Sequence, residues 1–337
     1  MRQPIVRPLH PLHHLRGTSF VTAALMLITA TAFAADPAWK PTKPVELVAI
    51  NAPGGGSDRI LRLMTKVFQD QRAMDVPVTV VNKPGGGGAM AYNYVAQQAD
   101  AHYLVLANKS MLTNNIVGRG PSYTEYTQVV NLFAEYISVT VKPDSPIKGG
   151  ADLIDRLKKD VTSLSLGIAT SIGNPNHQGL AVALHLGGVD IKKTRNVIFQ
   201  SGGAATTAVM GGHVDVAPVT AALAASLVRN QQVRVVAVAA PQRLGGVLAN
   251  VPTWREQGFD AVVSNSRTFL GAKSMTPAQL AYWERVFKRL TESAEWKKEL
   301  EENFWTNEYL PGAQARQQME RDDAQLRAFM RELALTK

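Results

Sequence analysis

Two glycine-rich stretches could bind an anion with backbone donors. The first is Asn51-Ala52-Pro53-Gly54-Gly55-Gly56-Ser57-Asp58, and the second is Asn82-Lys83-Pro84-Gly85-Gly86-Gly87-Gly88. Each follows an apolar run typical of a buried strand and precedes a helical pattern. Glycines at such a turn let the backbone approach a ligand closely, and the following helix points unpaired N–H groups at it. Because parallel strands end at the same edge of a sheet, we predict one shared site for a small anion.

The glycine spacing excludes the common nucleotide-binding loops. A G-x-G-x-x-G pattern would need glycine at two positions where the chain has Arg59 and Met90, and no Gly-Lys-Ser/Thr sequence is present. The alternative is that the glycines only serve tight turns. If the loops do bind an anion, we expect the N–H groups of residues 54–57 to face it. The Asp58 carboxylate would repel an anion, so we expect it to cap the helix or brace the loop.

Polar residues also follow predicted strands in the second half of the chain. The three stretches are Ala169-Thr170-Ser171-Ile172-Gly173-Asn174-Pro175-Asn176-His177, Phe199-Gln200-Ser201-Gly202-Gly203 and Pro218-Val219-Thr220. We expect them to face the first two loops across a cleft, a common place for small-molecule sites. His177 is expected to donate a hydrogen bond or cap its helix.

The sequence favours binding over catalysis. Ser171, His177 and Asp215 could be imagined as a nucleophile set, but the chain lacks a G-x-S-x-G elbow. The chain has no cysteine, which excludes thiol catalysis, and no two histidines beyond the N-terminal segment have metal-ligand spacing. We therefore expect no catalytic residue, no metal and no cofactor. The pairs Glu301-Glu302 and Asp322-Asp323 are expected to be solvated helix surface.

The N-terminus has the order of a secretory signal peptide. Three arginines precede the apolar run 20–28, and Ala32-Phe33-Ala34 supplies the small residues before a cleavage site. We predict a signal peptide over 1–34, cleaved after about Ala34, and a periplasmic mature protein. The alternative is an uncleaved membrane-anchoring N-terminus. The whole chain has a net charge of +9, and without the three arginines the mature chain is only mildly basic, which is not typical of a nucleic-acid-binding protein.

Alternating apolar runs and helical patterns predict an α/β fold with parallel strands. In the first half we expect strands at 45–50, 76–82 and 102–108, helices at 58–70 and 88–98, an irregular segment at 109–128 and a strand at 137–141. Pro143 and Pro146 then mark a break. A second unit is expected to have strands near 164–168, 197–199, 214–216 and 233–239, with helices at 153–159, 176–186, 203–211 and 220–229. A strand at 261–271 and helices at 276–291, 293–302 and 311–334 complete the chain.

The mature chain resembles the solute-binding proteins of tripartite tricarboxylate transporters, the Bug-type receptors. The first loop matches their Pro-Gly-Gly-x-x-Asp pattern and the second their Asn-Arg/Lys-Pro-Gly-x-Gly-Gly pattern. Further matches are Gly211-Gly212-His213-Val214-Asp215-Val216, Gln232-Val233-Arg234-Val235-Val236-Ala237-Val238, Val251-Pro252-Thr253 and Glu256-Gln257-Gly258.

The resemblance implies a two-domain periplasmic-binding-protein fold (type II, Venus flytrap) with two crossover strands. Domain 1 would be 36–138 plus 261–337, and domain 2 would be 139–260. Such a protein captures a small organic carboxylate and passes it to membrane transporter subunits, and we expect it to act as a monomer. The ligand could be a di- or tricarboxylate, an aromatic carboxylate or an amino acid. Alternatives are an exported hydrolase or transferase, or a receptor domain that presents its ligand to a signalling partner.

The resemblance also points to a set of binding residues. Many members have an aromatic residue before the first loop, where this chain has Asn51-Ala52. Arg267 could anchor a second carboxylate or form an ion pair. Asp58 and Asp215 are expected to brace loops. The predicted ligand-binding residues are Pro53, Gly54, Gly55, Gly56, Ser57, Gly86, Gly87, Gly88, Ser171, Ile172, Gly173, His177, Val219, Thr220 and Arg267.

Overall fold

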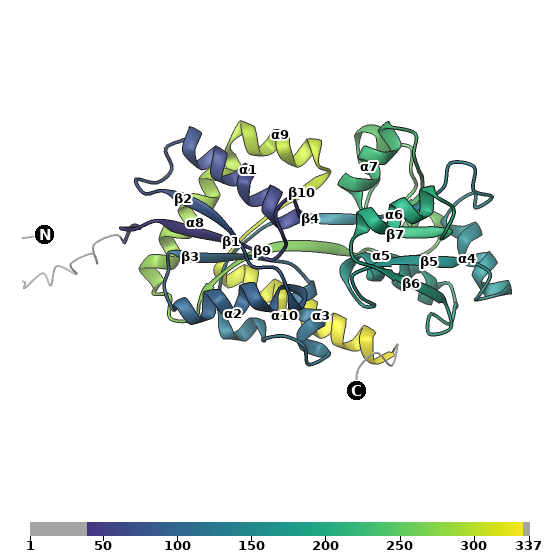
Figure 1. Cartoon of the computed structure of the whole chain (residues 1–337), viewed down its shortest axis with the longest axis horizontal. Coiled ribbons are helices and arrows are strands. Elements are labelled where there is room, and N and C mark those ends of the chain that lie inside the picture. Colours follow the sequence, from purple (N-terminus) through teal and green to yellow (C-terminus); the bar gives the residue numbers. More distant parts are fainter. Residues whose placement is uncertain (1–38, 333–337) are drawn as a thin grey trace, which may run out of the picture. The chain divides into compact units, whose positions relative to one another are not determined.

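The computed structural model describes residues 39–332, so the predicted signal peptide and its cleavage site lie outside the described residues. The described chain has ten strands in one sheet, with helices between them (Figure 1); eight of these strands follow one path of neighbouring pairs, and the other two each pair with one strand of that path. Within this part of the chain, none of the helices is both long enough and apolar enough to span a membrane.

The first half of the path contains the parallel strands that carry both glycine-rich loops. β1 (Val45–Ala49) lies between β2 (Val78–Asn82) and β3 (Tyr103–Ala107) and is parallel to both. α1 (Gly56–Asp70) and α2 (Ala89–Gln98) connect them, which confirms the predicted βαβαβ order. The two loops therefore start at the same end of two neighbouring parallel strands.

Helices cover both faces of the sheet at β1, so the side chains that alternate between its two faces are buried on either side. Leu47 packs on the side of α1 and α8 (Pro277–Glu292), whereas Val48 packs on the side of α2 and α10 (Gly312–Glu332). α9 (Ala294–Glu302) adds Trp296 to the first of these cores. Burial on both faces fixes β1, and with it the position from which the first loop starts.

The second half of the path repeats this plan. β5 (Ser165–Ala169) is parallel to β6 (Arg195–Phe199) and to β7 (Val216–Thr220). β8 (Arg234–Val238) pairs with β4 instead. The helices of this half are α4 (Gly150–Lys159), α5 (Pro175–Leu186), α6 (Gly202–Met210) and α7 (Ala221–Arg229).

Two long strands join the halves. β4 (Tyr126–Val141) pairs with β9 (Ser264–Ala272) and β10 (Trp305–Pro311) up to Tyr136, and with β7 and β8 from Ile137 onward. The chain returns through residues 261–264, where the Val263 N–H donates to the Ala239 carbonyl at 3.0 Å. The boundary predicted between residues 138 and 139 falls beside this change of partners, and the division into two domains stays a prediction.

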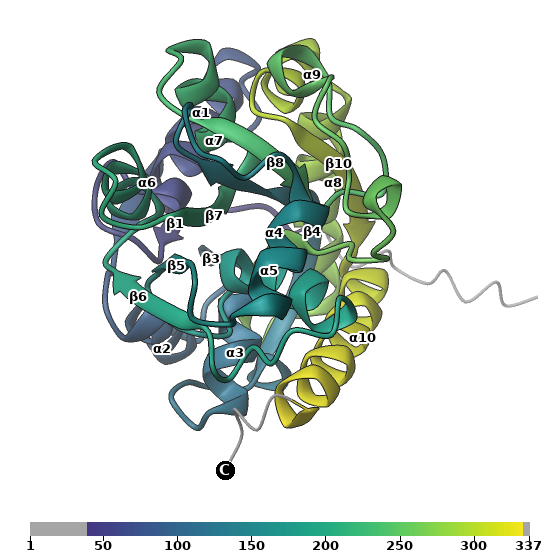
Figure 2. The ribbon, with the colours of Figure 1, turned by 90° about the vertical axis from the view of Figure 1, so that its right-hand side faces the viewer.

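The structure corrects four expectations about the elements. The segment 109–128 is not irregular throughout, because it contains α3 (Ser110–Ile116) and the start of β4. β4 is three times the expected length, and β10 was not predicted. β7 starts at Val216 and includes Pro218, so the last polar stretch is strand and not loop. Figures 1 and 2 both place α3 beside α10, and these two helices are in contact.

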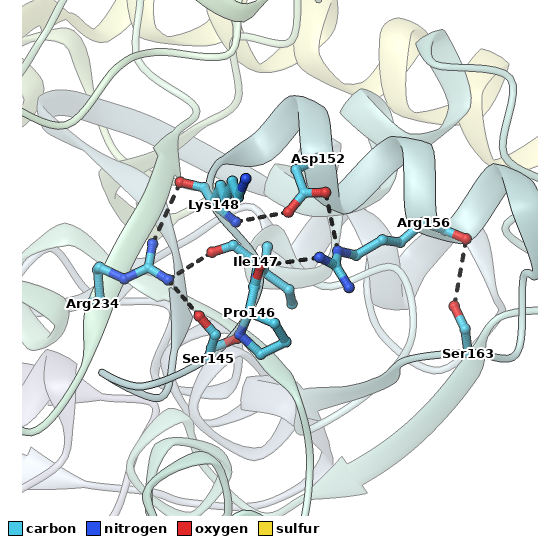
Figure 3. A network of polar contacts seen from close by, with 8 residues as sticks. All are labelled: Ser145, Pro146, Ile147, Lys148, Asp152, Arg156, Ser163 and Arg234. Carbon is cyan, nitrogen blue, oxygen red and sulfur yellow. Dashed lines mark hydrogen bonds and ion pairs between the residues drawn. The ribbon is translucent and has the colours of Figure 1, made fainter.

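The proline-containing connection after β4 is held tightly rather than left loose. Arg234 Nη2 donates to the carbonyls of Ser145 and Ile147 at 3.0 and 2.6 Å, as Figure 3 shows. The Lys148 N–H donates to Asp152, and Arg156 donates to the Pro146 carbonyl at 3.1 Å. These bonds satisfy backbone groups that the turn would otherwise leave to water.

One surface prediction is wrong. Asp322 is buried, and its Oδ1 lies 3.0 Å from Lys109 Nζ. The partner is far away in the sequence, so the charged helix pattern around Asp322 gave no sign of it. Glu301 and Glu302 are exposed, as predicted.

Candidate functional site

The first glycine-rich loop is fastened by two side chains. Asp58 is buried and accepts the Gly54 N–H at 2.8 Å, Arg62 Nε at 3.0 Å and Asn82 Nδ2 at 3.0 Å. The hydrogen bonds from Arg62, together with those from Gly54 and Asn82, hold the pKa of Asp58 at about 2. Asp58 is therefore ionised at neutral pH and joins the loop to the end of β2.

Asn51 makes the second set of bonds in this loop. Its Oδ1 accepts the Ser57 N–H at 3.2 Å and the Ser57 hydroxyl at 2.7 Å. A Cβ on Gly55 would lie 2.5 Å from Asn51 Cβ, so only glycine fits against this side chain. The sequence analysis noted Asn51 only as a departure from an aromatic residue and missed this role.

These bonds correct the expectation that all N–H groups of residues 54–57 face a ligand. Gly54 and Ser57 donate to side chains, and Gly55 donates to the Ala52 carbonyl at 2.9 Å. Within residues 39–332, the N–H groups of Gly56 and Asp58 have no hydrogen-bond partner. The first turn of α1 thus keeps two free donors, and Pro53 contributes exposed apolar surface beside them.

The second loop is shaped by the backbone itself. Gly85, Gly86, Gly87 and Gly88 all have positive φ, which L side chains rarely adopt. The Gly88 N–H donates to the Gly85 carbonyl at 3.0 Å, while those of Gly86 and Gly87 have no partner in the described chain. The N–H of Gly85 also lacks a partner in the described chain, so this loop offers three free donors, and no carboxylate takes them.

Asn82 brings the two loops together. Its Nδ2 donates to the Asn51 carbonyl at 2.9 Å and to Asp58 at 3.0 Å. The Lys83 N–H continues the ladder to the Ala49 carbonyl at 3.0 Å. The first residues of both loops are therefore tied side by side at the carboxyl edge of β1 and β2.

The unpredicted helix α3 links the second loop to the second half of the fold. Asn114 Nδ2 donates to the Gly87 carbonyl at 3.0 Å, and the neighbouring Thr113 hydroxyl donates to the Gly173 carbonyl at 3.0 Å. Both side chains are functional candidates that the sequence analysis missed. Their signal was weak because α3 is short and rich in Asn, Ser and Thr, which favour caps and turns over helix interiors.

The loop after β5 is built around the start of α5. Asn174 caps this helix by accepting the His177 N–H at 2.8 Å. The His177 ring is buried, and its Nδ1 accepts the Gly173 N–H at 3.1 Å, so the ring is an acceptor here and not the expected donor or cap. Burial lowers the pKa of His177 to about 4. His177 thus shapes the loop as a neutral ring.

Thr170 in the same loop has a strained backbone. Its φ is 57°, an unusual value for a β-branched residue. Bonds to Phe199 and Asn174 hold it there: its N–H donates to the Phe199 carbonyl at 2.7 Å, and its Oγ1 accepts Asn174 Nδ2 at 2.8 Å. Strained residues of this kind concentrate at ligand sites.

The three predicted neighbours of Thr170 lie in different surroundings. Ser171 is half-buried, and Ile172 packs against the apolar core that includes Leu180 and Leu184 of α5. Gly173 is buried, with Thr113 and Met330 so close that a Cβ would touch both. The N–H of Ile172 has no partner in the described chain, so the backbone of this loop can donate as well.

Of the predicted residues at the two ends of β7, Val219 needs correction. Val219 is fully buried in the strand and pairs with Ser138, so its side chain belongs to the core and not to a binding loop. Thr220, the last residue of β7, is half-buried and directly precedes α7. Asp215 lies at the opposite end of β7, where it accepts the N–H and the hydroxyl of Ser165 at 2.7 and 2.6 Å. It braces the start of β5 and not the polar edge.

Arg267 adopts one of its two predicted alternatives. Its Nε and Nη2 donate to Glu135 Oε1 at 2.9 and 2.7 Å, and both side chains are buried between β4 and β9. Because Glu135 already compensates its charge, Arg267 stabilises the crossover strands in this structure.

The edge that carries these loops is suited to an anion. Four N–H groups without partners, those of Gly56, Asp58, Gly86 and Gly87, lie on two neighbouring loops at the starts of helices. The helix dipole of α1 adds a favourable potential for negative charge.

Comparisons with known proteins identify the family and the fold of this chain. Residues 60–334 match the family described as "Tripartite tricarboxylate transporter family receptor". Among solved structures, MatC from Rhodopseudomonas palustris with bound malate is similar at 20% identity and a TM-score of 0.73, covering 86% of this chain and 99% of that one. A protein of R. palustris with adipate reaches a TM-score of 0.77 at 18% identity, covering 87% and 98%.

A third structure, the periplasmic binding protein BugD, has a TM-score of 0.75 at 18% identity, covering 88% of this chain and 99% of that chain. These similarities show the mixed α/β fold of periplasmic solute-binding proteins. The family and these neighbours are solute-binding proteins and not enzymes. Since the match spans most of the sequence, this chain belongs to the family of tripartite tricarboxylate transporter receptors.

Proposed function

We propose that this protein is a periplasmic receptor that captures a small organic carboxylate and delivers it to the membrane subunits of a tripartite tricarboxylate transporter. It acts as a monomer after its signal peptide is removed. The ligand is a di- or tricarboxylate or an aromatic carboxylate. The site consists of the two glycine-rich loops, with Ser171, Gly173 and Thr220 contributing from the second half of the fold.

The observation that carries the proposal is the set of four free N–H groups on neighbouring loops. A carboxylate can accept hydrogen bonds from these four donors without displacing any protein contact, because none of them has a partner in the described chain. The N–H groups of Gly54 and Ser57 keep the side-chain partners that hold the loop. Hydrogen bonds to a charged group contribute about 1.5–3 kcal/mol each. Four of them contribute about 6–12 kcal/mol before the entropic cost of association, a range that includes the value of about 8 kcal/mol needed for micromolar binding.

The solved relatives support the ligand class. MatC is described with malate and another relative with adipate, and both molecules are dicarboxylates. Contacts from both halves would favour a closed form, with β4 near Ile137 and the return segment 261–264 absorbing the motion.

The substitution Gly56→Val tests the site. A Cβ on Gly56 meets no atom within 4 Å, and its φ is not positive, so Gly56→Val adds methyl groups beside the free donors at little cost to the fold. Gly245→Val is the matched control, since Gly245 also has open space and negative φ.

Titration calorimetry with malate and adipate gives the readout. We expect at least tenfold weaker binding in Gly56→Val and unchanged binding in Gly245→Val. Equal affinity in both variants would remove the first loop from the site. A pull-down with the purified membrane subunits then distinguishes delivery to a transporter from presentation to a signalling partner.

A further inference from the structure

A cavity of about 370 Å³ is lined by residues outside the glycine-rich loops. Its walls come from α3, α5, α10 and the segment that enters β9. None of the predicted ligand-binding residues lines it. Its size is within the range of small-molecule sites. The polar lining residues are Lys109, Gln178, Ser264, Gln318, Asp322 and Gln325.

One side of the cavity carries a paired positive and negative charge. Lys109 Nζ lies 3.0 Å from Asp322 Oδ1 and 3.4 Å from the Ser264 hydroxyl. Gln318 Nε2 also donates to Asp322 Oδ1, at 3.1 Å. All these bonds to Asp322 use one oxygen, and in the described chain its Oδ2 accepts none.

Two amides add unused polar groups. Gln178 Nε2 donates to the Gly173 carbonyl at 2.7 Å, which leaves its Oε1 without a partner among the described residues. Gln325 is exposed and makes no hydrogen bond there. The rest of the lining is apolar and includes Val182, Val262 and Phe329.

We propose that this cavity is a second binding site and that it takes a zwitterionic α-amino acid with an aliphatic side chain. The ammonium group bonds to Asp322 Oδ2 and Gln178 Oε1. The carboxylate bonds to Lys109 Nζ and the Gln325 amide. The aliphatic chain packs on the apolar wall.

The adjacent charges on the protein decide this class. Lys109 and Asp322 keep their mutual ion pair, but Lys109 Nζ has a third N–H donor and Asp322 Oδ2 accepts no bond in the described chain, so a ligand with both an ammonium and a carboxylate group can bond to both residues without breaking the pair. An α-amino acid has its ammonium and its carboxylate group on the same carbon, so the two groups can reach Asp322 and Lys109, which lie 3.0 Å apart. This site is separate from the carboxylate site, so each can fail independently of the other.

Calorimetry with L-leucine tests the proposal, alongside 4-methylpentanoate and 3-methylbutan-1-amine, which each lack one of its charges. We expect both analogues to bind at least tenfold more weakly than leucine. Failure of leucine to bind at millimolar concentration, or equal binding of an analogue, would overturn the proposal.

Variants assign the bound leucine to the cavity. Val182→Phe should fill it and weaken leucine binding at least tenfold, and Gln325→Ala should weaken binding severalfold. Gln317→Ala is the control, because Gln317 is exposed on the same helix and does not line the cavity. If Val182→Phe fails to fold, leucine binding by Gln325→Ala decides, because Gln325 is exposed and its substitution should not affect folding. Leucine binding must survive Gly56→Val, and its loss there would place leucine in the carboxylate site and contradict the proposal.

Discussion

The two glycine-rich loops are alike in sequence and different in construction. In the loop 53–58, the side chains of Asn51 and Asp58 accept backbone N–H groups and hold the turn from inside. In the loop 84–88, four consecutive glycines with positive φ form the turn, and Asn114 from another helix donates a side-chain hydrogen bond to it. Within residues 39–332, both loops nevertheless keep free N–H donors.

The difference shows that one binding surface can be held in two ways. The first loop depends on a buried charge, so its stability should respond to acid and to loss of Asp58. The second depends on backbone conformation, so it should respond to any side chain added to its glycines. Each prediction below separates these two kinds of support.

Loss of the Asp58 carboxylate should have the largest effect on stability. Asp58→Ala leaves the Gly54 N–H without its acceptor and removes one of the two acceptors of Asn82, while the largely exposed Arg62 returns to water. We expect the free energy of unfolding in urea to fall by about 2–3 kcal/mol. Asp70→Ala, which removes an exposed i,i+4 pair, should cost less than about 0.5 kcal/mol. Equal losses in the two variants would show that Asp58 does not hold the loop.

Acid should weaken the first loop selectively. The folded pKa of Asp58 is about 2, below its ordinary value of 3.8, so its stabilisation is complete above about pH 5. It is lost as the pH falls from about 4 through 2, and amounts to about 2 kcal/mol. Urea unfolding of the wild type and Asp58→Asn at successive pH values should show the gap between them closing over this range. A gap that stays constant down to pH 2 would contradict the ionised brace.

Alanine in the two loops should separate backbone strain from crowding. Gly54 has positive φ but open space around it, so Gly54→Ala should cost about 1 kcal/mol. At Gly87 a Cβ would also lie 2.3 Å from Asn114 Nδ2, so Gly87→Ala should cost about 2 kcal/mol and weaken carboxylate binding about tenfold. Adding Asn114→Ala should recover part of the loss. No recovery in this double variant would exclude crowding as the cause.

Removing the support from α3 should have the smallest effect. Asn114→Ala deletes one partly exposed hydrogen bond to the Gly87 carbonyl, worth about 0.5–1 kcal/mol. Hydrogen exchange should accelerate at Gly86 and Gly87 while Gly54 stays unchanged. Equal acceleration in both loops would mean that they are not supported separately.

The regular part of the fold could be predicted from the sequence because its signals are local. Apolar runs such as Val45–Ala49, followed by glycine and a helical pattern, are complete within a few residues. The second loop could be located for the same reason. β4 could not be predicted at full length, because its first half contains the buried polar residues Gln128, Asn131 and Glu135.

The details of the site depend on contacts between distant residues. Nothing near Asp322 in the sequence indicates Lys109, and nothing near Gly87 indicates Asn114. The choice between two roles for Arg267 likewise required knowing that Glu135 lies across from it on the neighbouring strand. Local patterns therefore located the loops but not which of their donors remain free.

The free donors themselves can be observed directly. In the ¹⁵N-labelled mature protein, titration with malate or adipate should shift the amide resonances of Gly56, Asp58, Gly86 and Gly87 most strongly, because these N–H groups gain a charged acceptor. The amides of Gly54 and Ser57, which already have partners, should shift less. Saturable binding with these four resonances unmoved would contradict the claim that the two loops bind the carboxylate.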